Sequence, residues 1–216
     1  MTSCKVLPVG YAPRGTLNLA KNKRALIGLT LAILPLFALS GWLFLRLALL
    51  VRSDQATRDT LTGVVTRLPD HGLAVTVTPP WLLAFAVALL LLPLLHEAVH
   101  GAAFWFITRE RPTFAYKVLY AYAAAPGWYI GRTPYVIVAL VALTLGGLAL
   151  LPVIPAGLVP ALVGFLTFNA AGAVGDLAVV GWLAVRSATT LVRDEGDAIT
   201  LYSPALPHSP ACTSVA

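Results

Sequence analysis

Four apolar runs, separated by polar stretches, dominate the pattern of hydrophobic and polar positions along the chain. An α-helix needs about 17–25 mostly apolar residues to cross the hydrocarbon core of a bilayer, and each run reaches that length. The pattern therefore predicts four membrane-spanning helices, over residues 25–51, 81–107, 135–151 and 156–185. The fold class that this favours is an all-α integral membrane protein.

The segments between the runs are expected to be short hairpins or re-entrant pieces. In the stretch 52–80, β-branched residues alternate on both sides of the turn-like Pro69-Asp-His-Gly, which is typical of a small hairpin. Residues 113–133 are rich in aromatic side chains around Pro126-Gly127. This second stretch favours an interfacial or re-entrant segment with strand character.

The two ends of the chain are expected to be tails. Residues 1–24 are basic and interrupted by proline and glycine, and residues 191–216 end in a Pro/Ser-rich stretch that predicts partial disorder. Between the tails, residues 25–190 form the predicted membrane-embedded domain.

Composition strengthens the membrane assignment. Hydrophobic residues make up 58% of the chain and charged residues only 11%. A soluble domain has about 25% charged residues, so this chain has too little polar surface to cover a water-facing globule. A soluble enzyme is excluded on this ground, and the lipid bilayer is the expected partner.

The distribution of positive charge predicts an orientation. The formal net charge is +6, and five of the 15 Lys and Arg residues precede the first apolar run, where positive charge anchors a helix on the cytoplasmic side. No nucleic-acid-binding motif accompanies them, so we expect no nucleic acid partner. Because four spans put both ends on one side, the pattern predicts a multi-pass protein of the inner (cytoplasmic) cell membrane with both termini in the cytoplasm.

The candidate chemistry lies inside the second apolar run, which contains the HExxH pattern His96-Glu97-Ala98-Val99-His100. Residues four positions apart share one face of a helix, so His96 and His100 can bind one metal ion. Two imidazoles plus a carboxylate suit Zn²⁺ and leave a fourth position for a water molecule whose pKa falls to about 7. Glu97 would take a proton from that water and pass it to the leaving amine, which predicts hydrolysis of a peptide bond.

The motif supplies two ligands, and four other residues are candidates for the third: His71, His208, Asp176 and Asn169. The two histidines lie in a predicted loop and in a tail, where a solvated side chain explains them equally well. Asp176 is favoured because it lies about 15 Å inside the same membrane boundary as His100, at about 1.5 Å per residue. The alternative for Asp176 is a structural carboxylate that binds a neighbouring helix.

Asn169 lies two helical turns before Asp176 on the same predicted face. Its amide could orient a substrate or donate to an oxyanion, as amide side chains do in other hydrolases. It could equally form a packing hydrogen bond, which is common for Asn between spanning helices. The sequence leaves both roles open.

The chain resembles a family of small bacterial membrane proteins described as putative zincin peptidases, which is similar in layout to the site-2-protease group of intramembrane metalloproteases. The resemblance covers about residues 81–202 and rests on four segments: the HExxH motif, Arg132-Thr-Pro-Tyr135, Gly172-Ala-Val-Gly-Asp176-Leu177 after Asn169, and 193–202. It implies that His96, His100 and Asp176 bind zinc and that Glu97 is the catalytic base. Site-2 proteases usually carry the third ligand in an Asn-Pro-containing, Leu-Asp-Gly-like segment, and this chain has no proline there.

Two functions from different classes follow from these observations. The first is a zinc-dependent, membrane-embedded peptidase that cuts a membrane protein or a membrane-proximal peptide, with residues 113–133 offering an edge strand to an extended substrate. The second is a non-catalytic membrane protein that uses the His/Asp cluster for metal binding, transport or complex assembly. Transport would require further polar groups along a path through the spans, and the runs offer few.

Overall fold

The computed structural model of the protein describes residues 3–18, 22–67, 73–75, 79–116, 121–143 and 145–205, so the ligand candidates His71 and His208 lie outside it. Contacts divide the chain into two compact units. Unit 1 comprises Met1–Leu31, Leu94–Ala142 and Ala173–Ala216, and unit 2 comprises Ala32–Pro93 and Leu143–Gly172. Each unit is described by itself.

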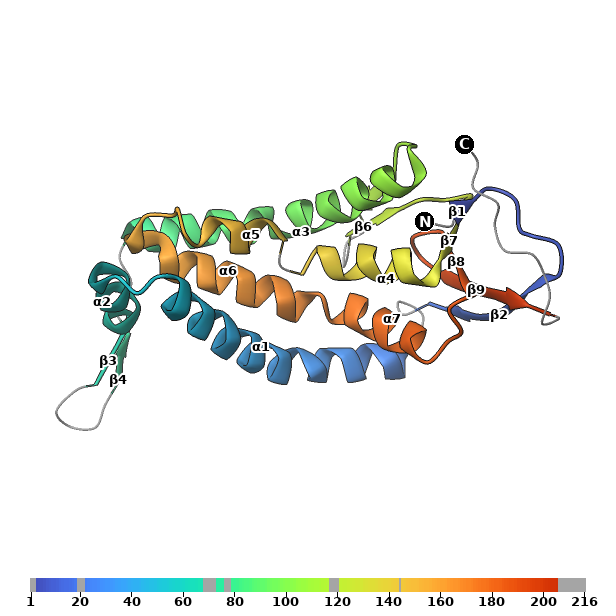
Figure 1. Cartoon of the computed structure of the whole chain (residues 1–216). Helices are drawn as coiled ribbons and strands as arrows, with labels where there is room; N and C mark the ends of the chain where they lie inside the picture. Colours follow the sequence, from blue (N-terminus) through green and yellow to red (C-terminus); the bar gives the residue numbers. More distant parts are fainter. Residues whose placement is uncertain are drawn as a thin grey trace. The chain divides into compact units, whose positions relative to one another are not determined.

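Among the residues that the structure describes, two helices are long and apolar enough to cross a membrane: α1 (Lys23–Val51) and α3 (Pro79–Thr108) (Figure 1). Only 6% of the apolar window of α1 is buried within the protein, and none of that of α3. So much exposed apolar surface is typical of helices that contact lipid. A broken pair of helices, α6 (Val159–Gly172) and α7 (Val174–Ala184), would make a third span if the two are counted as one.

The predictions of an all-α fold and of about four spanning helices are wrong. The described residues form a mixed α/β structure with a five-stranded antiparallel sheet and two smaller hairpins. The run 135–151 is divided between α4 (Arg132–Val141) and α5 (Leu145–Leu150), each too short to span. Apolar residues of α4, among them Val138 and Ala139, are buried in the protein's own core, and composition does not distinguish such residues from lipid-facing ones.

The large sheet lies in unit 1 and has the strand order β1-β7-β8-β9-β2 (Figure 1). Its strands are β1 (Ser3–Cys4), β2 (Tyr11–Leu17), β7 (Tyr129–Gly131), β8 (Leu191–Asp194) and β9 (Ile199–Pro204). β2 and β9 pair from Tyr11 opposite Pro204 to Leu17 opposite Ile199. The segments that the sequence analysis treats as two tails thus supply four of these five strands.

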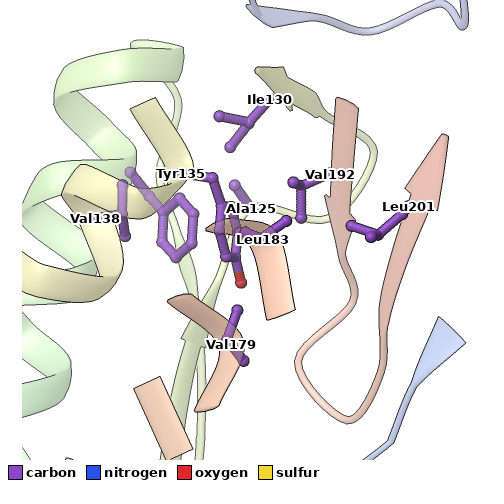
Figure 2. Close-up of a cluster of buried hydrophobic side chains, with 9 residues drawn as sticks. Ala125, Ile130, Tyr135, Val138, Val179, Leu183, Val192 and Leu201 are labelled. Carbon is purple, nitrogen blue, oxygen red and sulfur yellow. The ribbon is translucent and has the colours of Figure 1, made fainter. Parts of the chain in front are cut away.

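The core of unit 1 lies where the sheet meets three helices, as Figure 2 shows. Its buried side chains come from α3, α4, α7, strands β7, β8 and β9, and the residue that follows β6: Phe104, Ala125, Ile130, Tyr135, Val138, Val179, Leu183, Val192 and Leu201. Burial of a large apolar side chain stabilises a fold by about 1.5–3 kcal/mol, so this cluster fixes α4 and α7 against the sheet. The same helices carry residues of the candidate site.

Two hairpins complete the strands. In unit 1, β5 (Thr113–Tyr116) pairs with β6 (Ala121–Ala124), which confirms the strand character expected between residues 113 and 133. In unit 2, β3 (Val65–Arg67) pairs with β4 (Leu73–Val75), as the alternating residues around the Pro/Gly turn predict.

Unit 2 also contains α2 (Gln55–Val64), α5, the 3-10 helix η1 (Ala156–Leu158) and α6. Its core joins the end of α1 to α6 and the turn before it: Phe44, Ala48, Leu151, Val159, Leu162, Leu166 and Ala170. The Arg52 guanidinium donates to the carbonyl oxygens of Leu151, at 3.2 Å, and Ile154, at 2.7 Å. These two bonds hold the end of α1 to the turn that precedes η1.

Candidate metal centre

Three of the four predicted site residues of unit 1 converge on one point. His96 and His100 come from α3, and Asp176 comes from the first turn of α7. His96 Nε2 lies 3.0 Å from Asp176 Oδ2 and 3.1 Å from His100 Nε2, and His100 Nε2 lies 3.5 Å from Asp176 Oδ1. One ligand atom from each residue falls within a group no wider than 4.8 Å.

The local sequence explains why these side chains meet. A spacing of four residues on α3 stacks the two imidazoles on one face, with ring centroids 4.8 Å apart. The helix breaks at Ala173, so α7 begins at Val174 and Asp176 lies in its first turn. The free N–H groups of a first helical turn stabilise a carboxylate there.

The donor set and its spacing fit a zinc ion. Two imidazole nitrogens and one carboxylate oxygen are a common set of protein ligands in catalytic zinc sites. Four ligands at about 2.0–2.1 Å in a tetrahedron lie about 3.3–3.4 Å from one another. His96 Nε2 lies 3.0 Å from Asp176 Oδ2 and 3.1 Å from His100 Nε2, a few tenths of an ångström from that value, and His100 Nε2 lies 3.5 Å from the other carboxylate oxygen, Oδ1.

A backbone carbonyl sets the tautomer of His100. Its Nδ1 lies 3.0 Å from the carbonyl oxygen of Val138, and His100 is only 7% exposed. Because a carbonyl only accepts hydrogen bonds, Nδ1 carries the proton in the neutral ring and Nε2 keeps its lone pair. The helix α4 thereby points the ligating nitrogen of His100 at His96 and Asp176.

Glu97 lies beside the ligand group and has a different partner. Its Oε2 accepts the backbone N–H of Ala123, on β6, at 2.6 Å. This bond orients the carboxylate and leaves its second oxygen able to act on a proton. The arrangement has the parts of a hydrolytic site: a metal-binding group and an adjacent carboxylate base.

Asn169 belongs to unit 2, on α6. It is 7% exposed, and its Nδ2 donates to the carbonyl oxygen of Leu143 at 2.8 Å. The hydrogen bond is of the kind that a packing role of Asn169 requires. A role in binding substrate or an oxyanion stays a prediction.

One buried pair near the centre was not found from the sequence. The Tyr135 hydroxyl donates to Asp194 Oδ2 at 2.6 Å, and the two residues are 5% and 7% exposed. Burial raises the pKa of the Asp194 carboxyl, although hydrogen bonds from Tyr135 and the Gly196 amide oppose the shift. The available signal was the pair of segments 132–135 and 193–202 that carry the family resemblance, but the sequence analysis placed Asp194 in a tail.

Comparison with known proteins gives one family. No curated protein and no solved structure matches the chain. The matching segment begins before the HExxH motif, ends beyond Asp176, and includes Val138 of α4. Residues 89–190 match the family described as "Putative zincin peptidase", which confirms the resemblance expected from the motif.

Proposed function

We propose that the protein is a zinc-dependent, membrane-embedded peptidase that hydrolyses peptide bonds of a membrane protein or a membrane-proximal peptide. The observation that carries this proposal is the convergence of the ligand atoms of His96, His100 and Asp176 beside Glu97. The family match over residues 89–190 supports a metallopeptidase independently of that geometry.

Each residue then has a role in the chemistry. His96, His100 and Asp176 would hold the ion, which when bound supplies Lewis acidity and lowers the pKa of water. Glu97 accepts a proton from the attacking water and delivers it to the leaving nitrogen. The Ala123 amide keeps the Glu97 carboxylate in place during both transfers.

The hairpin of unit 1 suits an extended substrate. The Ala123 amide donates to Glu97, so this edge of β6 faces the carboxylate rather than β5. A peptide that added to this edge as a further strand would pass the base with its backbone extended. An extended backbone exposes a scissile bond, whereas the hydrogen bonds of a helix protect it.

The sheet supports a location in the cell membrane with both ends of the chain on its cytoplasmic side. β2 precedes α1, and its partner β9 follows α3. Hydrogen-bonded strands lie on one side of a bilayer, so the chain must cross it an even number of times between β2 and β9, as it does if α1 and α3 span and the broken pair α6–α7 does not. Lys5, Arg14, Lys23 and Arg24 lie before or at the start of α1, and positive charge favours the cytoplasm.

Zinc content and cleavage test the proposal separately. The full-length protein is purified in detergent with zinc supplied, and bound zinc is measured with cleavage of a membrane-anchored reporter peptide library. We expect about one zinc per wild-type chain, loss of zinc in His96→Ala and His100→Ala, and zinc retained without cleavage in Glu97→Gln. Glu195→Gln, an exposed glutamate of the same unit, is the matched control and should behave as wild type.

The outcomes separate the two functions. A wild-type protein without zinc under zinc-replete conditions would overturn the proposal. The non-catalytic alternative of metal binding, transport or assembly would be supported if zinc is bound through His96, His100 and Asp176 but no cleavage occurs. Cleavage that is the same in wild type and Glu97→Gln would also support it.

A further inference from the structure

We propose that residues 194–198, the last residue of β8 and the turn that leads to β9, are a positioning element of the metal centre; this segment is called the turn below. It acts through two separate contacts, one from Asp194 to α4 and one from Gly196 to β6. The inference rests on the proposed function, because it concerns the same site. It assigns roles to residues that neither contact a substrate nor bind the metal.

The first contact leads from the turn to His100. The Asp194 carboxylate accepts the Tyr135 hydroxyl at 2.6 Å with one oxygen and the Gly196 amide at 2.7 Å with the other. Tyr135 lies one helical turn before Val138, whose carbonyl accepts His100 Nδ1. Asp194 therefore fixes the stretch of α4 that sets the tautomer of His100.

Packing makes this first contact rigid. Tyr135 and Val138 both belong to the buried cluster of unit 1, together with Val192 of β8, as Figure 2 shows. The Tyr135 ring also lies 6.0 Å from the ring of Phe104, which is on α3 one turn after His100. A hydrogen bond between buried groups in such a core holds one geometry, because neither partner has an alternative in water.

The second contact leads from the turn to Glu97. Gly196 has φ +86°, and a Cβ built on it would lie 2.1 Å from Cε2 of Tyr122. The ring of Tyr122 thus rests directly on the glycine backbone. Tyr122 precedes Ala123, whose amide donates to the Glu97 carboxylate, so the turn holds β6 where that amide reaches the base.

The two contacts predict different defects. Loss of the first contact should weaken zinc binding, because removing the hydrogen-bond partner of a ligating histidine lowers metal affinity about 10–100-fold. Loss of the second should lower turnover and leave zinc affinity unchanged. Glu195 lies between the two residues but is exposed and pairs with Arg193 at 2.9 Å, so Glu195→Ala tests the turn without touching either contact.

The first contact is tested with Tyr135→Phe and Asp194→Asn in the full-length protein in detergent. We expect zinc affinity, measured against a competing chelator, to fall about 10–100-fold in both. In the metal-free protein, ¹⁵N spectra of labelled histidine should show a smaller share of the Nδ1–H tautomer at His100. Tyr11→Phe is the control, because it removes the hydroxyl of another buried tyrosine, bonded to the Thr189 carbonyl.

The second contact is tested with Gly196→Ala and Tyr122→Ala. We expect kcat to fall with KM and zinc affinity within twofold of wild type, and the Ala123 amide to exchange faster with solvent. Gly127→Ala is the matched control: Gly127 has φ +84°, nearly the same backbone strain, and no atom within 4 Å of a built Cβ. It should leave kcat and Ala123 exchange unchanged.

The results separate this inference from the proposed function. Wild-type zinc affinity and tautomer ratio in Tyr135→Phe would overturn the first contact, and unchanged Ala123 exchange in Tyr122→Ala would overturn the second. The tautomer and exchange measurements need neither zinc nor a substrate. They therefore still decide the inference if the wild-type protein proves to cleave nothing.

Discussion

The Ala123 amide donates to the Glu97 carboxylate over 2.6 Å, although 26 positions of sequence separate the two residues. The bond joins the β5–β6 hairpin to the helix that carries the HExxH motif. The base of the proposed reaction and the edge offered to a substrate are therefore positioned by one contact. A change that moves the hairpin should affect catalysis before it affects metal binding.

A substitution at Gly101 tests the effect of a change at the contact between the hairpin and α3. A Cβ on this residue of α3 would lie 2.3 Å from Cζ of Phe114, on β5, so Gly101→Ala must displace the ring through which the hairpin contacts α3. We expect cleavage to fall about 10–100-fold, as for a misplacement of about 1 Å, with zinc content unchanged. Assays of both quantities check this.

Two further variants make the test specific. Gly181→Ala adds a Cβ on α7 where no atom lies within 4 Å, and it should keep full activity. Phe114→Ala introduced into Gly101→Ala removes the collision and should restore part of the rate. An inactive Gly181→Ala, or no rescue by Phe114→Ala, would contradict the steric account.

Asp176→Asn should separate the contribution of the third ligand's charge to zinc affinity from the contribution of its shape. The amide keeps the size of the side chain but removes the only negative charge among the three ligands, which partly neutralises the 2+ charge of zinc because both imidazoles are neutral. We expect zinc affinity to fall at least as far as the 10–100-fold known for loss of outer partners. A chelator competition experiment measures it, with Asp59→Asn, an exposed aspartate of α2, as control. Equal affinities in the two variants would exclude Asp176 as a ligand.

Asp54 should make the stability of unit 2 depend on acid pH. Its carboxylate accepts the Thr57 amide at 2.9 Å at the start of α2 and Arg52 Nε at 3.0 Å, and these bonds lower its pKa from 3.8 to about 2. A lowered pKa in the folded state means stabilisation that is complete above pH 3.8 and is lost as the pH falls through about 2. The melting temperature in detergent should therefore fall between pH 5 and pH 2.

Asp54→Asn isolates that contribution. Asn keeps an oxygen that caps the helix but has no charge to titrate. The variant should melt below wild type at pH 5, and the difference should shrink toward pH 2. A difference that stays constant over this range would show that the charge of Asp54 does not contribute.

The pairing of β2 with β9 predicts that the two strands lie on the same side of the membrane, which cysteine labelling in cells can test. In a variant without the two native cysteines, single cysteines are placed at Val9, Glu195 and Gln55, all exposed. A membrane-impermeant maleimide should label Gln55→Cys in intact spheroplasts and the other two only after lysis. Labelling of Val9→Cys and Glu195→Cys under different conditions from each other would contradict the pairing of β2 with β9 on one side of the membrane.

The long helices could be predicted from the sequence because their apolar runs are continuous. The predicted spans 25–51 and 81–107 agree within two residues with Lys23–Val51 and Pro79–Thr108. The arrangement of His96 and His100 on one face followed from helical spacing alone. Asp176 was proposed from its depth, and the structure places it within hydrogen-bond distance of His96.

The sheet could not be predicted, because its strands are short and pair over long separations. β1 has two residues, and β2 contains Pro13 and Gly15 with a register shift between them. The role of Asp194 depends on this sheet, since only the placement of β8 brings its carboxylate to Tyr135. Apolar residues of α4 were assigned to lipid because burial in protein leaves the same pattern.

The partners Tyr11 and Pro204 stand 193 positions apart, so the large sheet imposes an order on biosynthesis. Chains are made from the N-terminus, and β2 must wait, unpaired, until α1 and α3 have emerged and β9 has been translated. A nascent chain that stops before Leu191 already carries the HExxH motif and Asp176 but has no bond between Asp194 and Tyr135. In the proposed arrangement, the metal centre is thus fully positioned only after β8 and β9 have been translated and paired.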